Sequence, residues 1–98
     1  MATLKLQQTH DDVRQKAVKA FREVAETQVA LGTAQELAGL RKEAEKRATT
    51  PEALRNPAAL AALLEATKNR MLAEVDAIKA DLAYRQAYVN LMTLIGHP

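Results

Sequence analysis

The 98 residues suit one domain at most, and their composition favours helices over a globule with a large core. Twenty residues are alanine and the only aromatic ones are Phe21, Tyr84 and Tyr88, so little apolar area per residue can be buried. The net charge is +2, from 14 basic and 12 acidic residues interleaved along the chain, as on solvated helix faces. Because the basic residues are not clustered and no nucleic-acid-binding motif occurs, we expect no nucleic acid partner.

Residue types that carry chemistry are absent or scattered. There is no cysteine, which excludes disulfides, cysteine-ligated zinc and thiol catalysis. Neither a phosphate-binding loop nor a nucleophile elbow occurs, so we expect no enzyme, no catalytic residue and no cofactor. His10 lies beside two aspartates, and adjacent side chains on a helix do not converge on one ion. We therefore expect no metal site, although a hairpin would bring His10 and His97 to the same end.

The sequence shows no pattern for membrane insertion or secretion. The longest apolar run, residues 57–64, is much shorter than the roughly 18 residues of a membrane span. Residues 1–8 lack the apolar region of a secretory signal peptide. We expect no direct membrane span in this segment, which is either cytosolic or part of a longer protein.

A first long helix is predicted over residues 4–49, which contain two glycines and no proline. Thr9 with Asp12 three residues later resembles a capping box, so we expect the firmly helical part to begin near His10. Small and apolar residues recur at alternating steps of three and four, as in heptads, and a second stripe lies beside them. The first stripe comprises Val13, Ala17, Ala20, Val24, Thr27, Leu31, Ala34 and Ala38, and the second comprises Val18, Phe21, Ala25 and Val29.

The run from Arg41 to Arg47 carries six charges in seven residues. Glu43 lies one turn before Arg47, and Arg41 lies one turn before Glu45. We expect a solvated helix with these two intrahelical ion pairs. The alternative is a patch that docks a partner.

The helical pattern breaks over residues 49–57, which are predicted to form the tip of a hairpin. Pro51 follows Thr50 and Pro57 follows Asn56, and each pair has the form of a helix cap followed by proline at the first helical position. Proline also disfavours a helical conformation in the residue before it. We expect one short helical turn over residues 51–54.

A second long helix is predicted over residues 57–95, because no glycine or further proline interrupts the pattern after Pro57. At about 1.5 Å per residue it would be roughly 58 Å long, and Gly96 is expected to cap it. The helix is apolar on two faces. One face comprises Leu60, Leu64, Met71, Val75, Ile78, Leu82, Val89 and Met92, and the neighbouring face comprises Ala73, Ala77, Ala80, Tyr84, Ala87, Leu91 and Leu94.

Polar side chains on this second helix are expected to be structural. Glu74 and Asp81 fall near the apolar faces, where carboxylates more often select a partner than act as catalytic acids. Tyr84 and Tyr88 lie one turn apart and are expected to pack between helices with their hydroxyls directed to water. The alternative for the tyrosines is an aromatic ligand site.

The fold class is therefore predicted as all-α: one long antiparallel two-helix coiled-coil hairpin. An isolated hairpin buries only the facing stripe of each helix, whereas each helix here carries a second stripe. We expect the hairpin to pack with further helices into a bundle or an α-helical barrel, and to be a segment of a larger protein.

Three groups of residues carry a family resemblance. They are Leu64-Glu65-Ala66 just past the tip, the Ala/Tyr-rich positions Ala77, Ala80, Tyr84, Ala87 and Tyr88 with the ending Leu94-Ile95-Gly96, and, in the first helix, Val13-Arg14, Val18 and Ala20-Phe21-Arg22-Glu23. Together they resemble the returning and descending helices of the periplasmic hairpin in TolC-like outer-membrane efflux proteins. The separation of Phe21 from Leu64 is similar to that in the hairpin of this family.

The resemblance implies a role in transport. Three protomers with two such hairpins each would form an α-helical barrel across the periplasm, as the periplasmic part of an outer-membrane protein. The Ala-rich stripes would pack against neighbouring hairpins, and the tip would meet a periplasmic adaptor protein of an efflux pump. The tip residues expected to bind this partner are Thr49, Thr50, Pro51, Glu52, Leu54, Arg55 and Asn56.

Twelve residues are expected to pack against other helices: Val13, Ala17, Phe21, Val24, Leu31, Leu64, Met71, Ile78, Ala80, Leu82, Tyr84 and Leu91. The alternative to the efflux channel is a free-standing coiled-coil scaffold or adaptor that self-associates as a four-helix bundle. A basic helical module for nucleic acid ranks below both.

Overall fold

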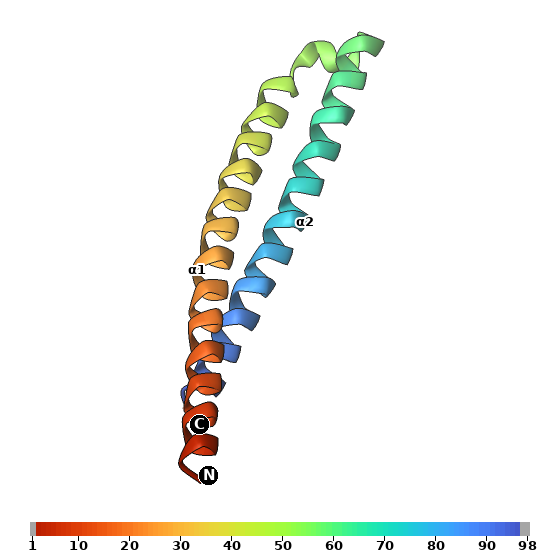
Figure 1. Cartoon of the computed structure of the whole chain (residues 1–98). Helices are drawn as coiled ribbons and strands as arrows, with labels where there is room; N and C mark the ends of the chain where they lie inside the picture. The colour runs from red at the N-terminus through yellow and green to blue at the C-terminus, as the bar shows by residue number, and fades with distance from the viewer. Residues whose placement is uncertain (1, 97–98) are drawn as a thin grey trace.

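The computed structural model describes residues 2–96, with side chains described from residue 7, as two long antiparallel helices joined by a short tip (Figure 1). Helix α1 spans Ala2–Ala48, the 3-10 helix η1 spans Pro51–Leu54 and helix α2 spans Pro57–Leu94. The described residues contain no strand. The predicted all-α hairpin is confirmed, and its packing into a larger bundle stays a prediction.

The hairpin is a rod. Its principal extents are 81 × 22 × 13 Å and its radius of gyration is 22.4 Å, whereas a compact domain of about 100 residues has a radius of gyration of only about 13 Å. Helix α1 has 47 residues and α2 has 38, so α1 extends past the end of α2 at the end opposite the tip (Figure 1). A rod of this width leaves most side chains in contact with solvent.

Helix α1 is continuous from Ala2, so the expectation that its firm part begins near His10 is wrong. Thr9 lies inside the helix rather than at its first cap. The residues before it include leucine, lysine and glutamine and neither glycine nor proline, and such residues propagate a helix without a cap.

The tip owes its geometry to the two prolines. Thr50 (φ −123°, ψ 158°) and Asn56 (φ −118°, ψ 120°) are both extended, as residues before proline prefer. The Asn56 Oδ1 caps α2 by accepting a hydrogen bond of 2.9 Å from the Ala58 amide, whereas the Thr50 side chain forms no cap bond. The predicted short helical turn is observed as η1. It leads the chain directly into α2, so the two helices run antiparallel.

Gly96 follows the end of α2 with φ +78°, a left-handed conformation that favours glycine. The Ile95 amide donates to the Leu91 carbonyl, 3.1 Å away, and the Gly96 amide donates to that of Thr93, 3.3 Å away. This glycine therefore ends the helix as expected.

The face of α1 that packs against α2 is the first stripe predicted from the sequence. Ala20 is only 5% exposed, and the stripe from Ala17 to Ala38 is half-buried elsewhere. The Thr27 hydroxyl on this face donates to the Glu23 carbonyl one turn earlier, 2.6 Å away, so its polar group is satisfied within the helix. Val13 is 52% exposed because it lies beyond the level of the last turn of α2.

The face of α2 that packs against α1, which we call the inner seam, is rich in alanine. Ala73, Ala87 and Leu91 are each 5% exposed. Small side chains let the two helices lie close together. Because α1 of the same hairpin covers this stripe, the expectation that the stripe packs against neighbouring hairpins is wrong. The complete inner seam is Leu63, Ala66, Arg70, Ala73, Ala77, Ala80, Tyr84, Ala87, Leu91 and Leu94.

Two glycines inside α1 have no packing reason within the hairpin. A Cβ atom added to Gly32 or to Gly39 would meet nothing within 4 Å. Each glycine destabilises an exposed helix by about 1 kcal/mol relative to alanine. The fold therefore carries two helix-weakening residues that its own contacts do not require.

Because the inner seam depends on small residues, Ala73→Phe should lower the free energy of unfolding by about 1–3 kcal/mol through overpacking. The matched control is Ala83→Phe, the same substitution at an exposed position of the same helix. Urea unfolding followed by circular dichroism measures both. Equal stabilities of the two variants would contradict the assignment of the inner seam.

Candidate functional site

An ion-pair cluster links the two helices near the tip. Arg70 lies on the inner seam, and its Nε donates a hydrogen bond of 2.7 Å to Glu45 Oε2 of α1. Its Nη1 donates to Glu74 Oε2, one turn along α2, at 2.9 Å. The side chains of Arg70 and Glu45 are 25% and 24% exposed, so both are partly withdrawn from water. One guanidinium thus holds a carboxylate from each helix and fixes their relative register.

The hydrogen bonds within this cluster shift the pKa values of Glu45 and Arg70. The hydrogen bond from Arg70 holds the pKa of Glu45 below its ordinary value, against the opposing effect of partial burial, and a hydrogen bond from the Thr67 side chain adds to the lowering. The hydrogen bonds to Glu45 and Glu74 raise the pKa of Arg70. The charged forms of Glu45 and Arg70 are therefore the ones the folded hairpin favours.

The two ion pairs expected within the run from Arg41 to Arg47 are not observed in the described part of the chain, and Glu45 instead contacts Arg70 of α2. Among the described residues, Glu45 pairs with Arg70 and not with Arg41, and Glu43 forms no ion pair with Arg47. A pairing across 25 positions cannot be found from spacing along one helix. The signal that could have found it is Arg70 itself, a charged residue at a heptad position between Ala66 and Ala73.

The larger apolar residues of α2 lie on a different face, which we call the outer seam. Its apolar members are exposed apart from Met92, which is half-buried, and Leu64 and Ile78 are 62% exposed and Leu82 61%. They recur at alternating steps of three and four, as in a second complete heptad pattern. The outer seam is Leu64, Lys68, Met71, Val75, Ile78, Leu82, Arg85, Val89 and Met92.

The tip presents mostly exposed side chains beyond the ends of both helices. Leu54 is 88% exposed, whereas its neighbour Ala53 is 2% exposed and anchors η1 against α2. All the predicted partner-binding residues of the tip, Thr49, Thr50, Pro51, Glu52, Leu54, Arg55 and Asn56, are exposed. The structure therefore brings them together as one surface at the end of the rod.

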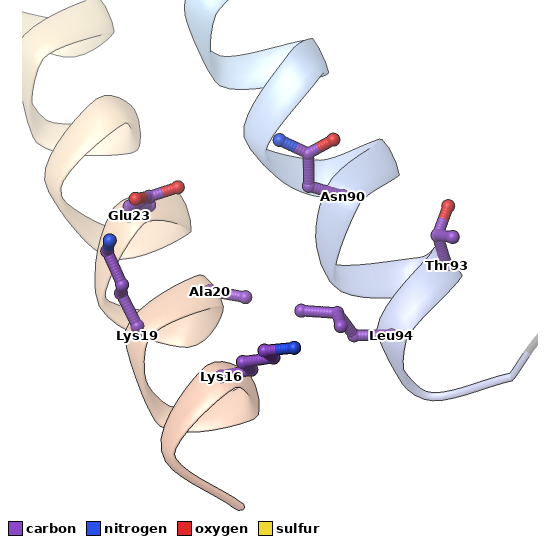
Figure 2. A pocket seen from close by; sticks show the side chains of 7 residues that line it. All are labelled: Lys16, Lys19, Ala20, Glu23, Asn90, Thr93 and Leu94. Carbon is purple, nitrogen blue, oxygen red and sulfur yellow. The ribbon is translucent and has the colours of Figure 1, made fainter. Parts of the chain in front are cut away.

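A cleft of about 400 Å³ lies between the helices near the opposite end (Figure 2). Lys16, Lys19 and Glu23 line it from α1, and Asn90 and Thr93 line it from α2. Figure 2 shows Ala20 and Leu94 pointing toward each other between the two helices. The Thr93 hydroxyl already donates to the Val89 carbonyl at 2.9 Å, and Asn90 Oδ1 accepts from Gln86 Nε2 at 3.0 Å. The charged groups that line the cleft are the ends of Lys16 and Lys19 and the Glu23 carboxylate.

The structure divides the twelve residues expected to pack against helices into two sets. Ala17, Val24, Leu31, Ala80, Tyr84 and Leu91 are half-buried or buried between α1 and α2. Val13, Phe21, Leu64, Met71, Ile78 and Leu82 are exposed. Packing of this second set against another helix stays a prediction.

Tyr84 and Tyr88, with Arg85 and Val89, line a second hollow of about 340 Å³ on α2, and the aromatic ligand site expected there as an alternative stays a prediction. The rings of Tyr84 and Tyr88 lie 6.5 Å apart, with Tyr84 half-buried and Tyr88 45% exposed. No group of three metal-ligating side chains gathers anywhere in the described part of the chain. His97 lies outside the described residues, so its expected approach to His10 stays a prediction. Within residues 2–96, neither helix has a stretch apolar and long enough to cross a membrane.

Comparisons of the chain with protein-family models, with curated proteins and with solved structures gave no match. The resemblance to TolC-like efflux proteins therefore rests on the residues quoted above and stays a prediction.

Protonation of Glu45 should weaken the hairpin in acid. Because its folded-state pKa is lowered, its contribution to stability is present above its ordinary pKa of about 4.3 and is lost as the pH falls through the lower, folded-state value. We expect the wild type to lose more stability than Glu45→Gln between about pH 5 and pH 3. Thermal unfolding across this range measures the difference.

The matched control is Glu52→Gln, because Glu52 forms no ion pair among the described residues. This variant should follow the wild-type pH dependence. A wild type and a Glu45→Gln variant with parallel pH profiles would contradict the stabilising role of the cluster.

Proposed function

We propose that this hairpin is a structural element of a helical wall, packing side by side with neighbouring hairpins as in a TolC-like efflux channel and presenting its tip to a periplasmic adaptor protein. The observation that carries the proposal is the position of the outer seam relative to the inner seam on α2. The role is mechanical, since the wall needs contacts between helices and no catalytic group.

The two seams of α2 lie on nearly opposite sides of the helix. In a heptad repeat each residue advances by about 103° around the helix axis. The heptad positions that the two seams occupy therefore place their centres about 150° apart around α2. A helix with partners on opposite sides belongs in a wall. A closed ring of the twelve helices that the resemblance implies also needs about 150° between the two interfaces of each helix.

A compact four-helix bundle requires a different arrangement. Each of its helices contacts two neighbours about 90° apart, so that all four helices surround one core. An outer seam that faces away from α1 cannot reach a core shared with α1. The free-standing bundle is therefore the weaker candidate for this chain.

The exposed tip supports docking at the end of the wall. Leu54 is an apolar side chain that is 88% exposed at the end of an 81 Å rod. A protein that binds this end would cover Leu54 without touching either seam. Tip contacts and wall contacts are therefore separable by substitution.

The outer seam should drive association. We expect the wild type to form species larger than a dimer in sedimentation velocity across a concentration series, and Leu82→Asp to abolish them because a charge on the seam loses its hydration on packing. Ala83→Asp is the matched control, at an exposed position outside both seams. A single closed dimer at all concentrations would contradict the wall.

The tip should bind a periplasmic adaptor independently of association. In a binding titration with a purified adaptor protein of an efflux pump from the source organism, we expect Leu54→Asp to weaken binding by about tenfold or more, as for an apolar contact residue at an interface. The same substitution should leave sedimentation unchanged. If Leu54→Asp bound the adaptor with the same affinity as the wild type, or if no form of the chain bound it, the result would count against the adaptor role.

A further inference from the structure

We infer that residues 13–22 of α1, near the end of the rod opposite the tip, dock on a bilayer surface that contains anionic phospholipids. The contact is made by an exposed face on which basic and apolar side chains lie together. This face, which we call the basic face, comprises Arg14, Val18, Lys19, Phe21 and Arg22. The inference does not rest on the proposed function and concerns a different part of the rod.

Residues 13–22 are the exception to the interleaved charges of the chain. Four of the 14 basic residues and none of the 12 acidic ones lie in this segment, so the rest of the chain is net acidic. The positive charge is thus concentrated in about 15 Å of helix. Acidic residues bound the segment on both sides, with Asp11 and Asp12 before it and Glu23 and Glu26 after it. The contact is therefore restricted to about three helical turns.

The basic face points away from α2. Ala20 is 5% exposed because it packs against α2, and Val18 lies about 160° from it around the helix axis. Arg14, Val18 and Arg22 follow one another at steps of four residues and so form a row on this outward side. In the described hairpin no basic side chain of the segment forms an ion pair. The charges of the row are therefore available to an anionic partner.

The basic face surrounds a hollow of about 350 Å³. Its lining residues are Arg14, Gln15, Val18, Lys19 and Arg22. Lys19 also lines the cleft between the two helices, together with Lys16 (Figure 2). Several N–H donors of charged groups thus border one space, which suits the oxygen acceptors of a phosphate group.

The apolar members of the basic face favour a bilayer over a nucleic acid. Val18 is 53% exposed and Phe21 is 59% exposed, and both lie among the cations. A phosphate backbone would pair with the cations but would leave these two side chains without an apolar partner. At a bilayer surface the cations meet headgroup phosphates while apolar side chains of the same helix enter the boundary with the acyl chains. The bilayer therefore accounts for both kinds of side chain.

Most of the basic face lies beyond the level of the outer seam. Glu45 is level with Arg70, and Ala20 lines the same cleft as Leu94, so Arg22 is level with Met92, the last member of the outer seam. The outer seam of a neighbouring hairpin with its tip at the same end therefore does not reach Arg14, Val18 or Lys19. Bilayer docking and side-by-side packing can occur in the same molecule.

Removal of charge from the basic face tests the inference. The probe is a vesicle of equal parts phosphatidylglycerol and phosphatidylcholine, and binding is measured by co-sedimentation at low salt. Because each basic residue near such a surface strengthens binding about fivefold, Arg14→Gln with Arg22→Gln should weaken binding by about twentyfold. The matched control is Arg41→Gln with Arg47→Gln, which removes the same charge from an exposed part of α1 and should bind like the wild type.

Truncation of the apolar side chain separates a bilayer from other polyanions. Phe21→Ala should weaken vesicle binding by about fivefold, because less apolar area enters the bilayer. The same variant should leave any binding to a DNA duplex unchanged. Leu40→Ala is the matched control, since Leu40 is 63% exposed on the same helix outside the basic face. Circular dichroism verifies that every variant keeps its helicity, as expected for substitutions at exposed positions by good helix formers.

Three results would overturn the inference. The first is equal binding to vesicles with and without phosphatidylglycerol, or no binding to either. The second is vesicle binding that the double arginine variant or Phe21→Ala leaves unchanged. The third is a DNA duplex bound more tightly than the anionic vesicles, which would assign the basic face to nucleic acid instead.

Discussion

Close contact between α1 and the alanine-rich inner seam of α2 is the constraint on which the rest of the structure depends. Alanines let the helices approach but bury little area, which is why Ala73 and Ala87 are 5% exposed while no large side chain is fully buried in the described part of the chain. Apart from Leu63, Tyr84, Leu91 and Leu94, the larger apolar residues of α2 then lie outside the contact with α1. They form the outer seam, and the surface offered to a neighbour follows from the way the hairpin closes.

Two local devices hold this arrangement in register. At one end, the prolines of the tip and the Asn56 cap start α2 at a fixed point. Close to it, Arg70 holds Glu45 and Glu74 at once, so sliding α1 along the alanine stripe would break a charge-assisted hydrogen bond. Alanine stripes alone specify register weakly because their side chains are alike. The ion-pair cluster supplies the specificity that the packing lacks.

The hairpin and both stripes of α2 could be predicted from sequence because proline, glycine and heptad spacing act locally. The choice of the stripe that faces α1 could not, since both stripes have the same period and the outer one contains more apolar area. The contact between Arg70 and Glu45 depends on the level at which the helices meet, which no spacing within one helix encodes. The continuous start of α1 shows that good helix formers before Thr9 override a capping pattern.

Small-angle X-ray scattering from the chain at a concentration where it is monomeric tests the central claim most directly, because the account requires a fully extended hairpin with its outer seam uncovered. The account predicts a rod with a radius of gyration near 22.4 Å and a longest dimension near 81 Å. A compact particle with a radius of gyration of about 13 Å would show that α2 folds back on itself and covers its own apolar face, and would contradict the account.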